Sequence, residues 1–113
     1  GTPLETLAHP QSRRVMSAEN VALLRKMLQR VVEEGTAQDA AWLEEGAGGK
    51  TGTAQTGQFT PDGTERKNLW FAGFYPAQQP RYTIVVLQDG QVSTEHSSAA
   101  IFARLCAMLD LLA

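Results

Sequence analysis

The fold of this chain is decided by the stretch Gly48-Gly49-Lys50-Thr51-Gly52-Thr53-Ala54-Gln55. Because glycine has no side chain to pack, three glycines in five residues indicate close approach of a ligand or of another backbone. Lys50 supplies a cation with three hydrogen-bond donors. Side chains alternate along a strand, so Thr51 and Thr53 place two hydroxyls on the same face. The stretch therefore predicts a polar strand suited to an anionic, carbonyl-bearing substrate.

Lys-Thr-Gly alone is a short string that also occurs in surface turns. The stretch is not a phosphate-binding P-loop, because that motif requires an earlier glycine at a fixed distance. No glycine precedes Gly49 at that distance. The rest of the chain must therefore decide between a surface turn and a binding strand.

Length and composition limit the possible functions. A chain of 113 residues with 42% hydrophobic and 19% charged residues is typical of one globular domain at most. The net charge of −2 and the scattered basic residues give no basis for binding nucleic acid. No apolar run approaches the roughly 20 residues of a membrane span.

The sequence predicts no metal site and no cofactor. The two histidines, His9 and His96, have no cysteine or carboxylate at metal-ligand spacing, so solvated side chains are the better interpretation. The single cysteine, Cys106, excludes an internal disulfide. It lies on an apolar helix face without a paired histidine, which favours a core thiol over a nucleophile.

Two helices are predicted. After an extended entry segment at 1–12, Ser17 is a fair N-cap and Gly35 a stop signal for a helix over 17–34. A second helix over 97–112 begins at a serine N-cap. The first helix is expected to bury Val21, Leu24, Leu28, Val31 and Val32, and the second to bury Ile101, Leu105, Met108, Leu109 and Leu112, a strip widened by Phe102 and Cys106.

The region 47–88 is predicted to form an antiparallel meander that includes the Lys-Thr-Gly strand. Pro61-Asp62-Gly63 is a turn signature after the first strand. The segments 68–75 and 82–87 are apolar on both alternating faces, which is typical of strands that are covered on both sides. Asp89-Gly90 is expected to end the third strand. The predicted fold class is α+β, an antiparallel meander of three or more strands with flanking N- and C-terminal helices.

Four runs, in this order, give the chain a family resemblance. The Lys-Thr-Gly stretch is preceded by Val31-Val32-Glu33-Glu34-Gly35-Thr36 and followed by Trp70-Phe71-Ala72-Gly73-Phe74-Tyr75-Pro76 and Tyr82-Thr83-Ile84-Val85-Val86. This combination resembles the C-terminal part of a penicillin-binding protein transpeptidase domain, within the serine β-lactamase and penicillin-binding protein superfamily. The resemblance covers nearly the whole chain after residue 12 and implies a fragment of that fold.

The resemblance implies roles for the residues of the Lys-Thr-Gly strand. Lys50 resembles the family's third-motif lysine, which acts in catalysis beside a serine nucleophile. Thr51 and Thr53 resemble the hydroxyls that bind the terminal carboxylate of a D-alanyl stem peptide, or of a β-lactam that imitates it. The backbone N–H of Thr53 resembles a catalytic donor of the oxyanion hole. Gly52 lets the substrate approach the strand, and Gln55 is grouped with the substrate-binding residues.

The chain departs from the family because it has no nucleophile motif. Acyl transfer through a covalent ester needs an activated nucleophile, so the chain alone is expected to be inactive. We expect a fragment of a longer transpeptidase of cell division or elongation, at the extracytoplasmic face of a bacterial inner membrane, with the serine-bearing helices and an anchor upstream. Neither Ser-x-x-Lys nor Ser-x-Asn occurs at the five serines, Ser12, Ser17, Ser93, Ser97 and Ser98.

Two other classes of protein stay open. A fragment of a β-lactamase or of a β-lactam sensor would share the Lys-Thr-Gly motif. A non-catalytic module that binds peptides or other proteins is compatible with the missing nucleophile. The expected partners of the longer protein are a peptidoglycan stem peptide or a β-lactam. For this chain, an upstream polypeptide or a second copy is expected to cover the apolar sheet.

Overall fold

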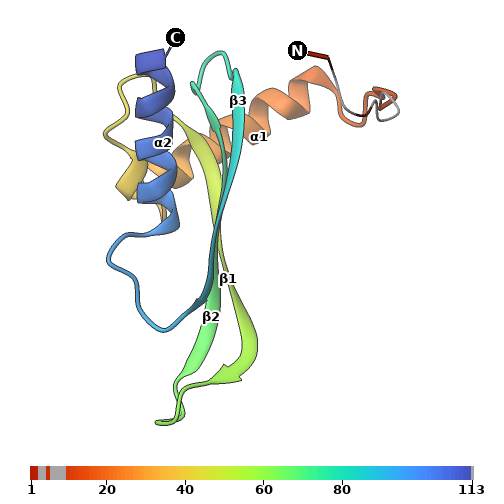
Figure 1. Cartoon of the computed structure of the whole chain (residues 1–113). Helices are drawn as coiled ribbons and strands as arrows, with labels where there is room; N and C mark the ends of the chain where they lie inside the picture. Colours follow the sequence, from red (N-terminus) through yellow and green to blue (C-terminus); the bar gives the residue numbers. More distant parts are fainter. Residues whose placement is uncertain (3–4, 6–9, 113) are drawn as a thin grey trace.

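A three-stranded antiparallel sheet lies at the centre of the fold, with one helix across a face and another beside an edge (Figure 1). The computed structural model describes residues 1–2, 5 and 10–112. The α+β prediction with flanking helices is confirmed. In chain order the elements are α1 (Ala18–Glu33), the 3-10 helix η1 (Gln38–Ala40), β1 (Gly48–Phe59), β2 (Glu65–Tyr75), β3 (Tyr82–Gln91) and α2 (Ser98–Leu112), and the strand order is β1-β2-β3.

Both long helices begin at the capping residues that the sequence predicts. The Ser17 hydroxyl accepts a hydrogen bond from a backbone N–H of the first turn of α1 (3.2 Å), and Ser97 does the same for α2 (3.1 Å). After α1, the Gly35 N–H donates to the Val31 carbonyl (3.1 Å). A Cβ on Gly35 would lie 2.9 Å from that carbonyl oxygen, so glycine is required there. Neither helix, as far as the structure describes them, is long and apolar enough to cross a membrane.

The sheet extends further than the sequence pattern predicts. β2 begins at Glu65, before the predicted start at 68, and β3 continues to Gln91, beyond the predicted limit of the meander at 88. The reason is that Asp-Gly does not end the third strand. The Asn68 side-chain oxygen accepts a hydrogen bond from the Gly90 N–H (2.8 Å), and the pairing continues beyond it from Lys67 to Gln91.

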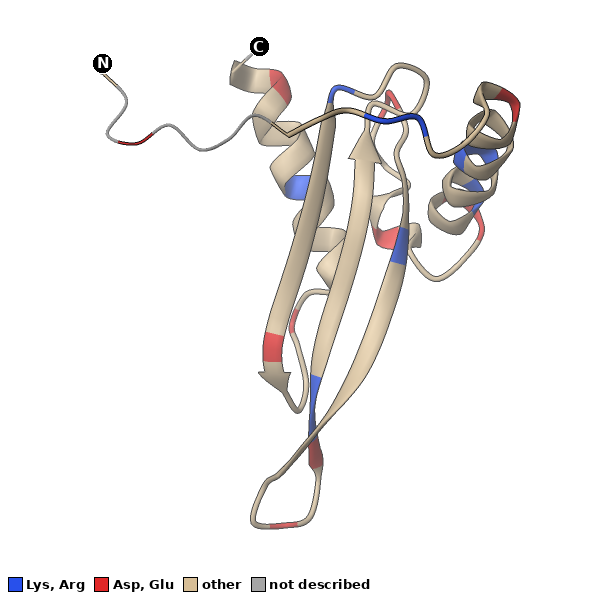
Figure 2. Ribbon diagram, turned by 90° about the vertical axis from the view of Figure 1, so that its right-hand side faces the viewer, with Lys and Arg blue, Asp and Glu red and all other residues tan. Residues whose placement is uncertain are grey.

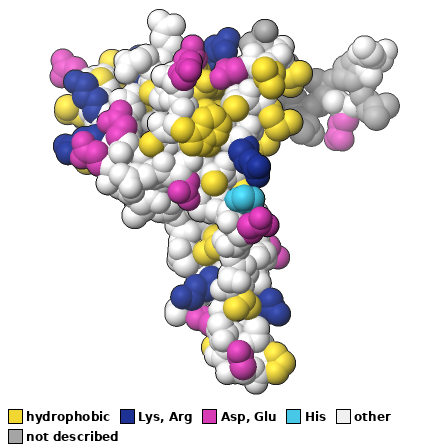
Figure 3. Space-filling view, turned by 90° about the vertical axis from the view of Figure 1, so that its left-hand side faces the viewer, with side chains coloured by type: hydrophobic (Ala, Val, Ile, Leu, Met, Phe, Trp, Pro, Cys, Tyr) yellow, Lys and Arg dark blue, Asp and Glu magenta, His cyan; other side chains and the backbone are white. Residues whose placement is uncertain are grey.

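One face of the sheet, the covered face, packs against α2. Phe71 of β2 and Phe102 of α2 are fully buried, with ring centroids 4.7 Å apart. The predicted buried strip of α2 is confirmed for Phe102 and Cys106 but wrong for Leu105, Met108 and Leu112, which are exposed. Figure 3 shows hydrophobic side chains on this side of the molecule. Small residues face the sheet instead, which lets the helix approach closely. The buried residues of α2 are Ser98, Ala99, Phe102, Ala103 and Cys106.

The core beneath α2 contains a thiol and a phenol. Cys106 is fully buried, as predicted, and burial raises the pKa of its thiol to about 12. The Tyr75 hydroxyl donates a hydrogen bond to the Asp110 carboxylate. Burial raises the pKa of Tyr75, and the hydrogen bond to Asp110 raises it further. Both groups stay protonated at neutral pH, so neither is an activated nucleophile.

Helix α1 packs against the sheet only near its C-terminal end. Val32 is buried, but Val21 and Leu24, which the pattern predicts to be buried, are exposed, and so is Met27. The physical reason is the direction of the helix, which points away from the sheet towards its N-terminus (Figure 1). The radius of gyration is 17.0 Å, larger than the roughly 13 Å of a compact domain of about 100 residues.

The second face of the sheet, the open face, is uncovered over its middle in the described structure. Trp70, Val85 and Leu87 lie there with 39%, 58% and 44% of their surface exposed. Trp70 pairs with Leu87, and Lys50 reaches the same face because strand side chains alternate. Figure 2 shows this face, with the strands in front of α2 and few charged residues over their middle. At one end of this face, Arg25 of α1 lies over the Phe74 ring, 6.0 Å from its centroid. The open face consists of Lys50, Gly52, Trp70, Ala72, Phe74, Thr83, Val85 and Leu87.

Candidate functional site

β1 is an edge strand that presents the predicted site residues on two faces. Among the described residues, β2 is the strand that pairs with it, and its other edge has no strand neighbour. Lys50 pairs with Ala72 on the open face, whereas Thr51 pairs with Phe71 and lies on the opposite face. Lys50 and Thr53 are exposed, and Thr51 is half-buried. The strand therefore brings a cation and two hydroxyls to one edge but directs them to different sides.

The three glycines of the stretch have different structural roles. A Cβ on Gly48 would lie 2.3 Å from the Phe74 ring, and one on Gly49 would lie 2.5 Å from a backbone carbonyl oxygen of β2. Packing within the sheet therefore requires glycine at 49, where the obstacle is backbone, and at 48 as long as the Phe74 ring keeps its position. A Cβ on Gly52 would meet only the Trp70 Cβ, at 3.5 Å, which is an ordinary contact. Packing does not require a glycine at this position, which leaves space beside the strand for a ligand.

Two contacts surround Thr51. The Lys50 Nζ donates to the Thr51 carbonyl oxygen (3.0 Å). The Thr51 hydroxyl lies 2.9 Å from the hydroxyl of Thr36, in the connection between α1 and η1. The role of Thr36 could not be predicted from the sequence, in which the only signal for it is its place directly after Gly35, ahead of the strand. One hydroxyl that the sequence assigns to substrate binding thus already has a partner within the protein.

Thr53 and Gln55 lie further along β1, and both are exposed. Thr53 is two residues from Thr51 and shares its face. Gln55 is four residues from Thr51, which corresponds to about 13 Å along a strand. The pairing of β1 with β2 becomes irregular just after Gln55. Thr53 is therefore close to Lys50 and Thr51, whereas Gln55 lies towards the hairpin.

The described residues contain no group of three or more His, Cys, Asp or Glu side chains that could hold a metal ion. His96 lies 3.9 Å from the Glu95 carboxylate, and His9 is outside the described residues. The candidate site on β1 consists of lysine, threonine, glycine and glutamine residues, which are not the usual ligands of zinc.

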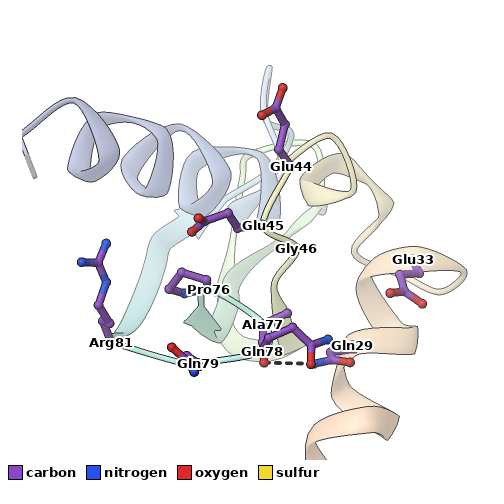
Figure 4. Close-up of a pocket in the computed structure, with 10 residues that line it drawn as sticks. All are labelled: Gln29, Glu33, Glu44, Glu45, Gly46, Pro76, Ala77, Gln78, Gln79 and Arg81. Atoms are coloured by element: carbon purple, nitrogen blue, oxygen red, sulfur yellow. Dashed lines mark hydrogen bonds between the residues drawn. The ribbon is translucent and has the colours of Figure 1, made fainter.

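A cavity of about 690 Å³ lies at the end of the sheet where β1 begins (Figure 4). Its wall joins α1, the loop before β1 and the β2–β3 loop, and the Gln29 side-chain amide donates to the Ala77 carbonyl across it (3.0 Å). Lys50, Thr51 and Thr53 do not line this cavity, so it is separate from the candidate site on β1. Its charged side chains are Glu33, Glu44, Glu45 and Arg81.

The fold and the edge strand define the class of protein. An antiparallel sheet with a helix across one face and Lys-Thr-Gly on an edge strand is the arrangement expected of the serine β-lactamase and penicillin-binding protein superfamily. The model of the penicillin binding protein transpeptidase domain family matches residues 5–107. The chain belongs to this family.

Curated relatives agree with the family. The chain is 37% identical over 82 residues to a peptidoglycan D,D-transpeptidase FtsI homolog from Chlorokybus atmophyticus, a match that covers 70% of the chain and 12% of the relative. It is 37% identical over 91 residues to the penicillin-binding protein PbpB of Mycolicibacterium smegmatis, covering 71% of the chain and 14% of the relative. It is 36% identical over 85 residues to the stage V sporulation protein D of Bacillus subtilis, covering 73% and 13%. The chain therefore spans about one seventh or less of the length of these relatives.

Solved structures show the same fold. Penicillin-binding protein 3 from Mycobacterium tuberculosis, in complex with ampicillin, matches 96% of this chain with a TM-score of 0.73 and 30% identity. The transpeptidase domain of penicillin-binding protein 3 from Burkholderia pseudomallei matches 88% of the chain with a TM-score of 0.62 and 32% identity. The chain covers 27% and 33% of these two structures, so it corresponds to one part of each.

Proposed function

We propose that this chain is the C-terminal portion of a serine D,D-transpeptidase that crosslinks peptidoglycan stem peptides and is acylated by β-lactams. The observation that carries the proposal is the Lys-Thr-Gly-Thr segment, in which Thr51 alone is half-buried and the other three residues are exposed, on the edge strand of a chain that matches the transpeptidase family over 5–107. The name of one relative, a peptidoglycan D,D-transpeptidase FtsI homolog, supports the reaction. The ampicillin complex of a structural neighbour supports the ligand class.

Lys50 is the proposed catalytic cation. Its side chain lies on the open face, and the Nζ donates to the Thr51 carbonyl (3.0 Å), which holds the ammonium beside the strand. A positive charge at this position favours the alkoxide of a serine nucleophile and stabilises negative charge that develops in acyl transfer. The serine itself would come from the upstream polypeptide.

The remaining residues of the strand are proposed to bind the substrate. The Thr51 and Thr53 hydroxyls donate to the terminal carboxylate, the Gly52 backbone allows close approach, and Gln55 extends the contact along the strand. The N–H and C=O of one residue in an antiparallel strand point to the same side, and that side recurs every second residue. Because the Thr51 carbonyl accepts from Lys50, the Thr53 N–H is expected to point to the outer edge, where it can serve the oxyanion hole. Removal of such a donor costs about 2.7–4 kcal/mol in transition-state stabilisation.

The open face is proposed to receive the upstream polypeptide that carries the nucleophile. Trp70, Val85 and Leu87 expose apolar surface there, and Lys50 lies on the same face. The relatives are about seven or more times longer than the matched part of this chain, so such a polypeptide is available in proteins of this family. We place the longer protein in the bacterial cell envelope, at the extracytoplasmic face of the inner membrane.

Two alternatives are weighed against this proposal. A β-lactamase or β-lactam-sensor fragment would use the same strand, but the three curated relatives are named as a transpeptidase, a penicillin-binding protein and a sporulation protein. A non-catalytic binding module would also expose the strand. That alternative predicts binding of a D-Ala-D-Ala peptide by the isolated chain, which the transpeptidase proposal does not require.

Labelling with a fluorescent penicillin tests the proposal. The longer protein, obtained by reading its gene upstream of the codon for Gly1, should carry a covalent label on a denaturing gel. The chain of 113 residues alone should carry none, because it has no nucleophile motif. Addition of the separately expressed upstream part to this chain should restore the label on the upstream part.

Heat-denatured protein is the control for adventitious labelling. A label on the isolated chain would show that it contains a nucleophile of its own. An unlabelled longer protein would overturn the proposed function.

A further inference from the structure

The connection between α1 and η1 touches the candidate site at a single hydrogen bond. Thr36 Oγ1 lies 2.9 Å from Thr51 Oγ1, although the residues are 15 positions apart in the sequence. Within the described part of the chain, this is the hydrogen bond recorded for the Thr51 hydroxyl. The geometry of this contact decides what the Thr51 hydroxyl can offer to a ligand.

Thr36 is held in place by its two neighbours. Gly35 cannot carry a side chain, because a Cβ would lie 2.9 Å from the Val31 carbonyl oxygen. The Ala37 N–H donates to the same carbonyl (3.1 Å), and Ala37 is fully buried. Although the Thr36 side chain is exposed, its backbone is therefore fixed between the end of α1 and the core.

The direction of the hydrogen bond follows from the chemistry of the ligand. Either hydroxyl could be the donor in the absence of a ligand. A hydroxyl has one proton to donate and can accept others, whereas an ionised carboxylate can only accept. If Thr51 donated to Thr36, its proton would not be free for a carboxylate. When Thr36 donates to Thr51, the Thr51 proton is free.

We propose that Thr36 is a positioning residue for carboxylate recognition, an inference that rests on the proposed function. Thr36 donates its proton to the Thr51 oxygen and so directs the Thr51 proton to the terminal carboxylate of the substrate. Two hydroxyls in series polarise each other, and a hydrogen bond to an ionised acceptor is stronger than one between neutral groups. Thr36 acts only through Thr51 and does not touch the substrate.

Substitutions in the longer protein test this role. Thr36→Val keeps the size of the side chain but removes the donor, and Thr36→Ser keeps the hydroxyl. We expect Thr36→Val to lower the second-order rate constant of acylation by a penicillin about threefold to tenfold. With the methyl ester of the same penicillin, Thr36→Val and the wild type should have equal acylation rate constants, because the ester has no ionised carboxylate to bind. Thr36→Ser should restore the rate with the free acid.

A double-mutant comparison separates this inference from the proposed function. Thr36→Val combined with Thr51→Val should react no more slowly than Thr51→Val alone, because Thr36 acts through Thr51. The inference would be overturned if the two substitutions lowered the acylation rate constant additively. It would also be overturned if Thr36→Val lowered the rate constants of the acid and the ester equally. If Thr51→Val itself leaves acylation by the acid unchanged, the carboxylate role in the proposed function fails as well.

The matched control is Thr94→Val, in the connection between β3 and α2, where the described structure shows no hydrogen bond of the threonine side chain. It should leave the ratio of the acid and ester rate constants unchanged. Equal melting temperatures of Thr36→Val and the wild type exclude a general loss of structure as the cause.

Discussion

The two faces of the sheet differ in how their apolar residues are covered. On the covered face, Phe71 and Phe102 are fully buried, with ring centroids 4.7 Å apart. On the open face, Trp70 and Leu87 keep 39% and 44% of their surface exposed. Phe71 and Trp70 are consecutive residues of β2, yet their surroundings are opposite. The covered face therefore has its packing partner within this chain, whereas we expect the open face to receive a second surface.

The largest expected effect concerns the covered face. Phe102→Ala should lower the free energy of unfolding of the chain by about 3–5 kcal/mol, because it leaves a cavity against Phe71. Trp70→Ala, on the open face, should cost only about 1 kcal/mol. Urea denaturation followed by circular dichroism measures both values.

Because Phe102→Ala can abolish folding, Phe102→Leu provides a smaller change, with an expected cost of less than about 1.5 kcal/mol. Equal losses for the alanine variants at 102 and 70 would mean that the two faces do not differ in this way.

The second prediction concerns the site residue on the open face. In the longer protein, Lys50→Ala should slow acylation by penicillin at least about a hundredfold, which corresponds to about 2.7 kcal/mol. The melting temperature should stay nearly unchanged, because Lys50 is exposed and contributes little to packing. Stopped-flow acylation and calorimetry measure the two quantities.

Lys67→Ala is the matched control, since Lys67 is another exposed strand lysine. Acylation of the Lys50→Ala variant at the wild-type rate would show that the lysine is not catalytic. A large loss of stability would instead assign it a structural role.

The third prediction concerns self-association of the isolated chain through the open face. Leu87→Glu should weaken association about tenfold, because burying one such side chain contributes about 1.5 kcal/mol or more. Leu111→Glu is the control, since Leu111 is 86% exposed on α2, away from the open face. Sedimentation velocity at micromolar concentration gives the dissociation constants. A wild-type chain that is monomeric and unfolds cooperatively would show that the open face needs no cover.

The smallest expected effect concerns Cys106, beneath α2, which makes the free energy of unfolding depend on pH. Burial raises the pKa of the folded thiol to about 12, against about 8.5 in an unfolded chain. The contribution of this thiol to the free energy of unfolding is therefore fully present below pH 8.5. It falls at higher pH, where the unfolded chain loses the proton, by less than about 1 kcal/mol at pH 9. Urea titrations of the wild type and of Cys106→Ala at pH 7 and pH 9 give this difference. If the free energy of unfolding changed equally with pH in the two proteins, the Cys106 thiol would not be shielded from water in the folded chain.

The sequence was sufficient to predict the two long helices and the three strands, but not η1 or the full length of the sheet. Ser17, Gly35 and the turn after β1 are local signals, and local signals fix where helices and strands begin. The orientation of α2 could not be predicted, because that helix is apolar on most of its surface. Hydropathy favours Leu105 for the core, but packing against the sheet selects the smaller Ala103.

The contacts within the candidate site could not be predicted from local sequence patterns, because they join residues that are far apart in the chain. No local pattern indicates that Thr36 meets Thr51, since the two hydroxyls approach only when α1 docks beside β1. The alternation of Lys50 and Thr51 between faces follows from strand geometry alone. Which of those faces is open depends on where α2 packs, and the strand sequence does not contain that information.

The glycines at the start of β1 also protect the register in which the strand pairs. A slip of one residue in one direction would place Lys50 where Gly49 lies, against a backbone carbonyl oxygen that a Cβ would approach to 2.5 Å. A slip in the other direction would place Ala47 where Gly48 lies, and its Cβ would fall 2.3 Å from the Phe74 ring. Either slip would also exchange the faces of the lysine and the threonines. The same two glycines that let the strands pack therefore disfavour a misaligned hairpin, in which the lysine and the threonines would face the wrong sides.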